Sequence, residues 1–232
     1  MSRFREVFCN RHVVLPVIHV VNTEQAIENT RLAKRSQADG VFLINHDLTW
    51  QTLLAVHANC VEAIPDFWIG VNCLDLEPNR VFGEVDSKVG GVWVDNALIE
   101  ESCVEQPGAE KVLRAIQDSG WRGLYFGGVA FKYQRVVEDV ETAARVALPF
   151  VDVVTTSGPG TGLSANPVKI RSMRSGVGRE PLAVASGITP ENVIEYLPFT
   201  DCFLVATGIC RTIDALDEDL TTGLVSRIRN YH

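Results

Sequence analysis

The chain has 232 residues, of which 46% are hydrophobic and 22% charged, and its formal net charge is −8. This length and composition are those of a globular protein, so we expect one domain over residues 1–232. The acidic balance and the lack of a Lys/Arg cluster argue against nucleic acid as a partner, and the lack of a long apolar run or a signal peptide argues against membrane insertion, so we expect a cytoplasmic protein.

Eight short apolar runs divide the sequence. Most of them lack polar alternation, which is what strands buried on both faces of a sheet require. The runs cover residues 13–20, 41–45, 67–73, 91–94, 123–128, 151–155, 182–185 and 203–206. We therefore expect eight strands, each covered on both sides by other elements.

Segments with helical features lie between most of these runs. Thr23 is expected to cap a helix over residues 24–38, and Pro190 is expected in the first turn of a helix that continues over residues 191–197. Further helices are predicted over residues 52–61, 109–118, 136–147, 167–174 and 216–229. Strands and helices thus alternate along the chain.

Strict alternation predicts parallel strands joined by right-handed crossovers. Eight units in this chain have about 29 residues each, the length that one strand and its helix need. A doubly wound open sheet would give the same local pattern, but no GxGxxG motif follows the first run. We therefore predict an α/β fold, a single (β/α)8 TIM barrel, with both chain ends at its amino-terminal side or on its flank.

The turns after the last two runs indicate a phosphate site, which this fold commonly forms there at the carboxyl ends of the strands. Ser186 and Gly187 follow the seventh run, and Thr207 and Gly208 follow the eighth. A glycine lets backbone N–H groups approach an anion, and a helix beginning after it adds a favourable dipole. We predict that these four residues bind a small phosphorylated molecule; alternatively, both glycines only form tight turns.

The loop after the sixth run is rich in glycine and hydroxyl groups, which is unusual for a short connection. Ser157, Gly158 and Thr161 belong to this loop and are the expected ligand contacts. They would form a lid or one wall of the site. The alternative is a flexible loop without a function.

Asp47, His19 and Lys132 are the predicted catalytic residues. Asp47 follows His46 after the second run. Because neighbours on a strand point to opposite faces, we expect at most one of the two at the ligand unless the loop bends, and we prefer Asp47. His19 could be a base, a metal ligand or a hydrogen-bonded core histidine. Lys132 could pair with an anion, form a Schiff base if burial lowered its pKa, or be a solvated loop lysine.

The cysteines predict neither a disulfide framework nor a metal site. They are Cys9, Cys60, Cys73, Cys103, Cys202 and Cys210. No two of them form a CxxC pair, so we interpret them as reduced and mostly buried thiols. No metal and no cofactor is expected.

Several of these segments together resemble the BtpA family, barrel proteins named for a cyanobacterial factor needed for photosystem I to accumulate. The resemblance runs over nearly the whole chain. It includes Leu-Pro-Val-Ile-His at 15–19, Gly-Val-Asn at 70–72, Phe-Lys at 131–132, Ser-Gly-Pro-Gly-Thr-Gly at 157–162 and Ser-Gly-Ile-Thr-Pro-Glu-Asn-Val at 186–193. The last two motifs are specific together.

The resemblance implies membership of the ribulose-phosphate-binding barrels, which include phosphoribosylanthranilate isomerase, indole-glycerol-phosphate synthase and the tryptophan synthase α subunit. This grouping supports a phosphate site. The isomerases carry a catalytic Cys at the end of the first strand, where this chain has His19, which argues against that activity. The chain also departs from the BtpA pattern, because it has Asn-His-Asp at 45–47 where relatives often have Glu-Asn, and Gly-Gly at 127–128 where they have Ala-Asp. If that Asp is catalytic in relatives, the chemistry has changed or been lost.

The function that these observations favour is that of an isomerase, lyase or aldolase acting on a phosphorylated sugar or nucleotide precursor. A second hypothesis is a non-catalytic assembly or regulatory factor that uses the barrel as a scaffold, as the family name suggests. A third is a barrel that binds FMN through the same phosphate site. A homo-oligomer is compatible with all three.

Overall fold

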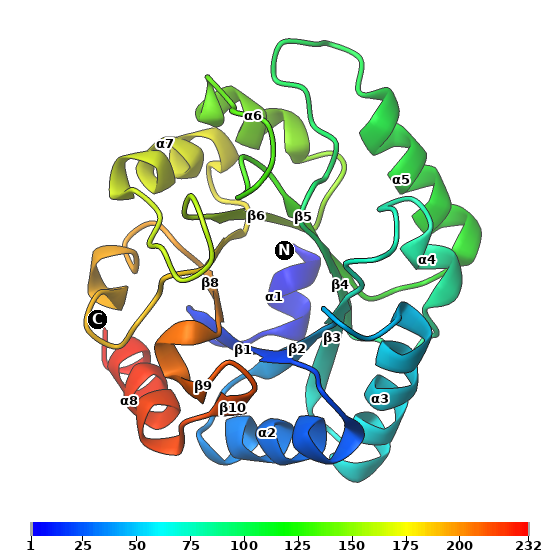
Figure 1. Cartoon of the computed structure of the whole chain (residues 1–232). Coiled ribbons are helices and arrows are strands. Elements are labelled where there is room, and N and C mark those ends of the chain that lie inside the picture. Colours follow the sequence, from blue (N-terminus) through cyan, green and yellow to red (C-terminus); the bar gives the residue numbers. More distant parts are fainter. Residues whose placement is uncertain (1, 232) are drawn as a thin grey trace.

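The computed structural model describes residues 2–231 and shows eight parallel strands closed into a barrel, with helices around it (Figure 1). The strands are β1 Val13–His19, β2 Gly40–Ile44, β3 Trp68–Asn72, β4 Gly91–Val94, β5 Leu124–Gly128, β6 Val153–Ser157, β7 Leu182–Ala185 and β8 Cys202–Val205. Each strand pairs with its successor, and β8 pairs with β1 to close the ring. The predicted (β/α)8 barrel is confirmed, and each apolar run overlaps one strand.

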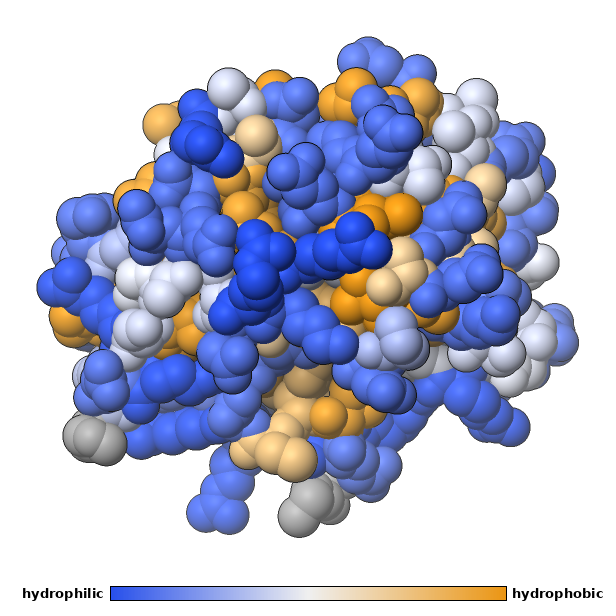
Figure 2. All heavy atoms as spheres, turned by 90° about the horizontal axis from the view of Figure 1, so that it is seen from below, coloured by the Kyte–Doolittle hydropathy of each residue, from blue (hydrophilic) through white to orange (hydrophobic). Residues whose placement is uncertain are grey.

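Helices cover the outer face of the barrel (Figure 1). They are α2 Thr23–Arg35, α3 Trp50–Ala63, α4 Val81–Glu84, α5 Pro107–Ser119, α6 Val140–Ala147, α7 Pro167–Val177 and α8 Glu218–Arg229. In α5, Pro107 occupies the first turn and Gly120 ends the helix at φ +67°, while Ala109 and Val112 are buried. The flank that carries α2 is mostly hydrophilic outside, with hydrophobic residues in small groups (Figure 2).

Two predictions about helices are corrected, one on a cap and one on a whole helix. Asn22, rather than Thr23, caps α2, because its side chain accepts a hydrogen bond from the backbone N–H of Gln25. The predicted helix over residues 191–197 is wrong: only a short 3-10 turn, η1 Val193–Glu195, forms there. Pro198 follows this segment and disfavours a helical conformation at the residue before it, so the turn cannot lengthen.

The interior of the barrel is filled with aromatic rings. The Phe42 ring of β2 lies edge-on to Trp68 of β3 and to Phe126 of β5, with 5.1 Å between ring centroids in both pairs. Phe4 belongs to a short helix, α1 Arg3–Val7. Its ring packs edge-on to Phe126, with 6.3 Å between ring centroids. The sequence did not predict α1, which lies in the middle of the ring (Figure 1).

Charged contacts show which end of the barrel α1 occupies. Arg3 donates two hydrogen bonds of 3.0 Å to the carboxylate of Asp152, and Arg5 forms an ion pair with Asp201. Both acidic residues precede strands, β6 and β8 respectively. The helix therefore closes the amino-terminal end of the barrel.

Two further elements were not predicted. One is α4, which stands between β3 and β4. The other is a hairpin formed by β9 Cys210–Thr212 and β10 Ala215–Leu216. A 3-10 turn, η2 Thr207–Ile209, connects β8 to this hairpin. Gln25 and Asn29 of α2 donate hydrogen bonds of 2.6 and 2.7 Å to the Asp214 carbonyl in the hairpin turn. The hairpin is thereby fixed at the carboxyl end of the strands.

The last helix returns to the same end of the barrel as α1. Arg229 of α8 pairs with Asp39, which precedes β2, and donates a hydrogen bond to the carbonyl of His12, which precedes β1. The expected placement of both chain ends is confirmed for the described residues. Within residues 2–231 no helix combines the length and apolar character needed to span a bilayer.

Candidate functional site

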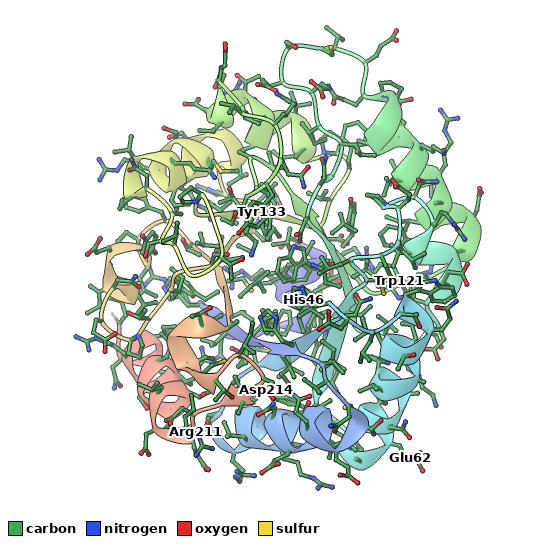
Figure 3. All side chains as sticks on the ribbon, viewed as in Figure 1. His46, Glu62, Trp121, Tyr133, Arg211 and Asp214 are labelled. Carbon is green, nitrogen blue, oxygen red and sulfur yellow. The ribbon has the colours of Figure 1, made fainter. Side chains whose placement is uncertain are left out.

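A cavity of about 550 Å³ opens at the carboxyl ends of the strands. Figure 3 shows His46 near the middle of the ring, with Tyr133 and Asp214 on opposite sides of it. The polar lining residues are His19, His46, Asp47, Asp95, Lys132, Tyr133, Thr161, Ser186, Thr207 and Asp214. This is the end of the fold at which TIM barrels carry their active sites.

Two histidines form a hydrogen-bonded pair in the cavity. The rings of His19, at the end of β1, and His46, just after β2, are nearly parallel, with 4.8 Å between centroids, and Nδ1 of His19 lies 2.7 Å from Nε2 of His46. Burial lowers the pKa of His19 to about 4, and the charges of His46 and Lys132 add to this effect. His19 is therefore neutral near pH 7 and can accept a proton or a hydrogen bond.

Asp95 brings a half-buried carboxyl group to the cavity from the end of β4. Burial raises the pKa of Asp95, whereas a hydrogen bond of 3.0 Å from the Asn72 amide and the charges of Lys132 and His46 act in the opposite direction. A carboxyl group with a raised pKa close to a basic group is a candidate general acid or base.

Lys132 supplies a positive charge close to the strands that end in the predicted phosphate site. Its ammonium group lies 3.3 Å from the hydroxyl of Thr161 and 3.3 Å from the hydroxyl of Ser186. In the described part of the chain, it is hydroxyls and not carboxylates that accept hydrogen bonds from this group. Among the described residues Asp95 lies close enough to feel the charge of Lys132, but no carboxylate forms an ion pair with it. An ammonium group bonded only to hydroxyls in such a cavity favours an anionic ligand.

The four predicted phosphate-binding residues divide into two groups. Ser186 and Thr207 line the cavity, whereas Gly187 and Gly208 are not among its lining residues. A Cβ on Gly187 would lie 2.2 Å from the backbone nitrogen of Ser164, and one on Gly208 would lie 1.9 Å from a carbonyl oxygen. Both glycines are therefore required because neighbouring backbone approaches them closely.

Ser186 adopts a strained conformation with φ +68°, a region that few non-glycine residues occupy. This conformation places its hydroxyl beside the Lys132 ammonium group. The next residue, Gly187, also has a positive φ, +64°. The tight double turn therefore brings a hydroxyl to the cavity at a cost in backbone strain.

The predicted ligand loop reaches the cavity only in part. Thr161 lines it, but Ser157 and Gly158 line a neighbouring hollow of about 410 Å³. The Ser157 hydroxyl accepts a hydrogen bond of 2.8 Å from the backbone N–H of Lys132. Ser157 therefore holds the segment that carries Lys132.

Lys169 of α7 ties the same two segments together. Its ammonium group donates hydrogen bonds to the carbonyl oxygens of Ala130 and Ser157. Burial lowers the pKa of Lys169 to about 8. The buried charge thus fixes the ends of β5 and β6, from which Lys132 and Thr161 extend.

The structure brings all three predicted catalytic residues to one cavity, together with Ser186, Thr207 and Thr161. Both His46 and Asp47 line the cavity, which the sequence allowed only if the loop bends. Because β2 ends at Ile44, the alternation of a strand no longer applies to them.

Asp95 was not predicted as a site residue, although it follows the fourth apolar run directly. Its position at a strand end was the only signal in the sequence. Among residues 2–231 no group of three or more His, Cys, Asp or Glu side chains is arranged to hold a metal ion. The histidine pair thus has no third ligand within the described chain.

No known family model and no curated protein sequence matches the chain. Solved structures do match. The (S)-3-O-geranylgeranylglyceryl phosphate synthase from Thermoplasma acidophilum, in complex with sn-glycerol-1-phosphate, has a TM-score of 0.69 and 13% identity over 100% of both chains. The phosphoribosyl anthranilate isomerase from Thermus thermophilus has a TM-score of 0.66 and 15% identity over 93% of this chain and 98% of that one.

The tryptophan synthase α subunit from Legionella pneumophila has a TM-score of 0.67 and 13% identity over 100% of both chains. At such identities the likeness shows the TIM-barrel fold. Two of these three neighbours are named for phosphorylated compounds.

Proposed function

We propose that this chain is an enzyme that binds a small phosphorylated molecule in the cavity and acts on it as an isomerase, lyase or aldolase. The observation that carries this proposal is the convergence of Asp95, the His19–His46 pair and Lys132 on one cavity at the carboxyl ends of the strands. These groups supply a proton acceptor, a proton donor and a cation within one site.

The phosphate would lie on the side of the cavity formed by the ends of β7 and β8. Lys132 and the hydroxyls of Ser186, Thr207 and Thr161 are the side chains available there. A lysine surrounded by hydroxyls matches the charge and the hydrogen-bond acceptors of a phosphate. The structural neighbours named for phosphorylated compounds support the same class of ligand.

Proton transfer would fall to the groups at the ends of β1, β2 and β4. A neutral His19 can accept a proton, and Asp95, whose pKa is raised, can donate or accept one. His46 is hydrogen-bonded to His19 and would fix the tautomer of that ring. Isomerisation, elimination and aldol cleavage all need such a pair of groups near a polarised carbonyl.

The family resemblance supports a BtpA-like protein within the ribulose-phosphate-binding barrels, and the structural neighbours support the wider barrel group. The motifs behind the resemblance fall on the cavity or beside it. His19 ends the first motif, Lys132 belongs to another, and Ser186 opens the last.

Binding of sn-glycerol 1-phosphate and inorganic phosphate, measured by isothermal titration calorimetry, tests the anion site. Lys132→Met should weaken binding about tenfold or more, because a charge-assisted hydrogen bond contributes about 1.5–3 kcal/mol. Lys111→Met, on the exposed face of α5, removes the same charge from the surface and should leave the affinity unchanged. Equal affinity in all three proteins would place the anion elsewhere.

Turnover separates an enzyme from a non-catalytic scaffold. A set of phosphorylated sugars is incubated with the protein and followed by phosphorus NMR. We expect one of them to be converted, and Asp95→Asn to reduce the rate at least about a hundredfold while ligand affinity stays within a few-fold. If glycerol phosphate binds but no sugar phosphate is converted, the enzyme proposal fails and the result supports a non-catalytic scaffold.

A further inference from the structure

The walls of the cavity are more apolar than a sugar phosphate alone requires. Strand residues Val17, Ile44, Trp93 and Leu204 line its inner part, at the ends of β1, β2, β4 and β8. The charged and hydroxyl groups described above lie among these residues. One part of the ligand surface is therefore expected to be apolar, since apolar contacts stabilise binding only when they exclude water from an apolar partner.

The mouth of the cavity is also apolar, although it is exposed. Val21, Leu74, Tyr133 and Ile213 line the cavity with exposed fractions of 53%, 41%, 75% and 73%. We call these four residues the apolar rim. They come from the segments after β1, β3 and β5 and from the β9–β10 hairpin, so they surround the opening from several sides.

Trp93 adds an aromatic surface to the inner part of the cavity. It lines the cavity and is 4% exposed. Its ring packs edge-on to Phe42 and to Phe131, with 5.8 Å between ring centroids in both pairs. The inner wall is therefore aromatic as well as aliphatic and is held in place by the barrel core.

Taken with the phosphate side formed by Lys132 and Ser186, these features point to one class of substrate. We propose that the cavity takes an amphiphilic phosphorylated molecule, in which a phosphate-bearing polar part is joined to an aromatic or extended aliphatic group that lies against the apolar rim. The inference rests on the proposed function, because it assigns the second half of the same ligand. The rim is continuous with the cavity, which is why we assign it to the ligand and not to a protein partner.

Calorimetry with four probes tests the proposal: inorganic phosphate, sn-glycerol 1-phosphate, phenyl phosphate and octyl phosphate. We expect phenyl or octyl phosphate to bind about tenfold tighter than glycerol phosphate or more, since burying two methylene groups already gives such a factor. The comparison of phenyl with octyl phosphate shows whether the apolar group is aromatic or aliphatic.

Variants of the rim give the sharper test. The double variant Leu74→Asn/Ile213→Asn changes two exposed side chains without adding charge, so the fold should tolerate it, and it should abolish the advantage of phenyl and octyl phosphate. Its affinity for glycerol phosphate should stay within about twofold. The matched control is Val104→Asn, because Val104 is fully exposed and is not a lining residue, and this variant should bind all four probes like the parent.

The possible outcomes are distinct. If glycerol phosphate binds and the apolar phosphates bind no tighter, or if their advantage survives in the double variant, the inference is wrong while the proposed function stands. If none of the four probes binds, both fail. If sedimentation shows that the double variant dissociates an oligomer without changing any affinity, the rim contacts a second copy of the chain and the inference is overturned.

Discussion

The two stacked histidines give the site a group whose protonation is coupled to folding. His19 has a pKa of about 4 in the folded chain, chiefly because of burial, against an ordinary value of 6.5. Between these two pH values the unfolded chain binds a proton that the folded chain does not, so the free energy of unfolding decreases as the pH falls. Above about pH 6.5 both states are neutral at this position and the contribution is constant.

We therefore expect His19→Gln to reduce the acid sensitivity of the protein. Urea unfolding at about pH 5 and about pH 7.5 should show a smaller loss of stability in the variant than in the parent. Between about pH 7.5 and about pH 8.5 the difference between the two proteins should not change, which is the internal control. An unchanged loss at about pH 5 would mean that His19 titrates normally in the folded state.

Close packing of neighbouring backbone explains the glycines in the turns after β7 and β8. A Cβ at Gly208 would meet the Ile188 carbonyl oxygen at 1.9 Å, whereas a Cβ at Gly83 in α4 would meet nothing within 4 Å. The same substitution should therefore have opposite consequences at these two positions.

Gly208→Ala should destabilise the protein by about 1–3 kcal/mol, because backbone must move to admit the methyl group. Gly83→Ala should be neutral or stabilise by up to about 1 kcal/mol, since it restricts the unfolded chain. Thermal unfolding of both variants measures the contrast. If Gly208→Ala were as stable as the parent, the turn would have room for a methyl group and the contact with the Ile188 carbonyl oxygen would not explain the glycine.

At the scale of elements, α1 contributes to the barrel core although only a few residues form it. Phe4 is fully buried and contacts Phe126, while Val7 on the same helix is 46% exposed. The helix is too short to be stable alone, so its packing against the barrel must hold it.

Phe4→Ala should lower the free energy of unfolding by about 3–5 kcal/mol, the range for a buried phenylalanine that leaves a cavity. Val7→Ala is the matched control on the same helix and should change it by less than about 1 kcal/mol. Both are measured by urea unfolding. A small effect of Phe4→Ala would show that the strands close the barrel without the helix.

Strands and helices differ in how well the sequence predicts them. The strands are predicted because each is covered on both faces and is therefore a continuous apolar run. The helix over residues 191–197 fails because Pro190 and the Glu-Asn pair after it resemble a helix start, while Pro198 shortens the segment to a turn. The α1 and α4 helices are missed because neither is long enough to show a helical period.

For the whole molecule, the barrel could be predicted, whereas the chemistry of its site could be predicted only in part. The rule that ligand sites lie at strand ends leads to His19, Asp47 and Lys132, all of which line the cavity. It does not show which strand ends meet, so the contact of His19 with His46 and the burial of Asp95 could not be predicted. These depend on distances between segments far apart in sequence.

The contacts of α1 also bear on the order of folding. This helix precedes every strand, yet Arg3 bonds to a residue 149 positions downstream and Arg5 to one 196 positions downstream. The surface on which α1 packs exists only once β5, β6 and β8 are in the ring, so docking belongs to a late step. Contacts that form after the transition state slow unfolding without accelerating folding. The contacts of α1 would therefore mainly lower the unfolding rate of the closed barrel.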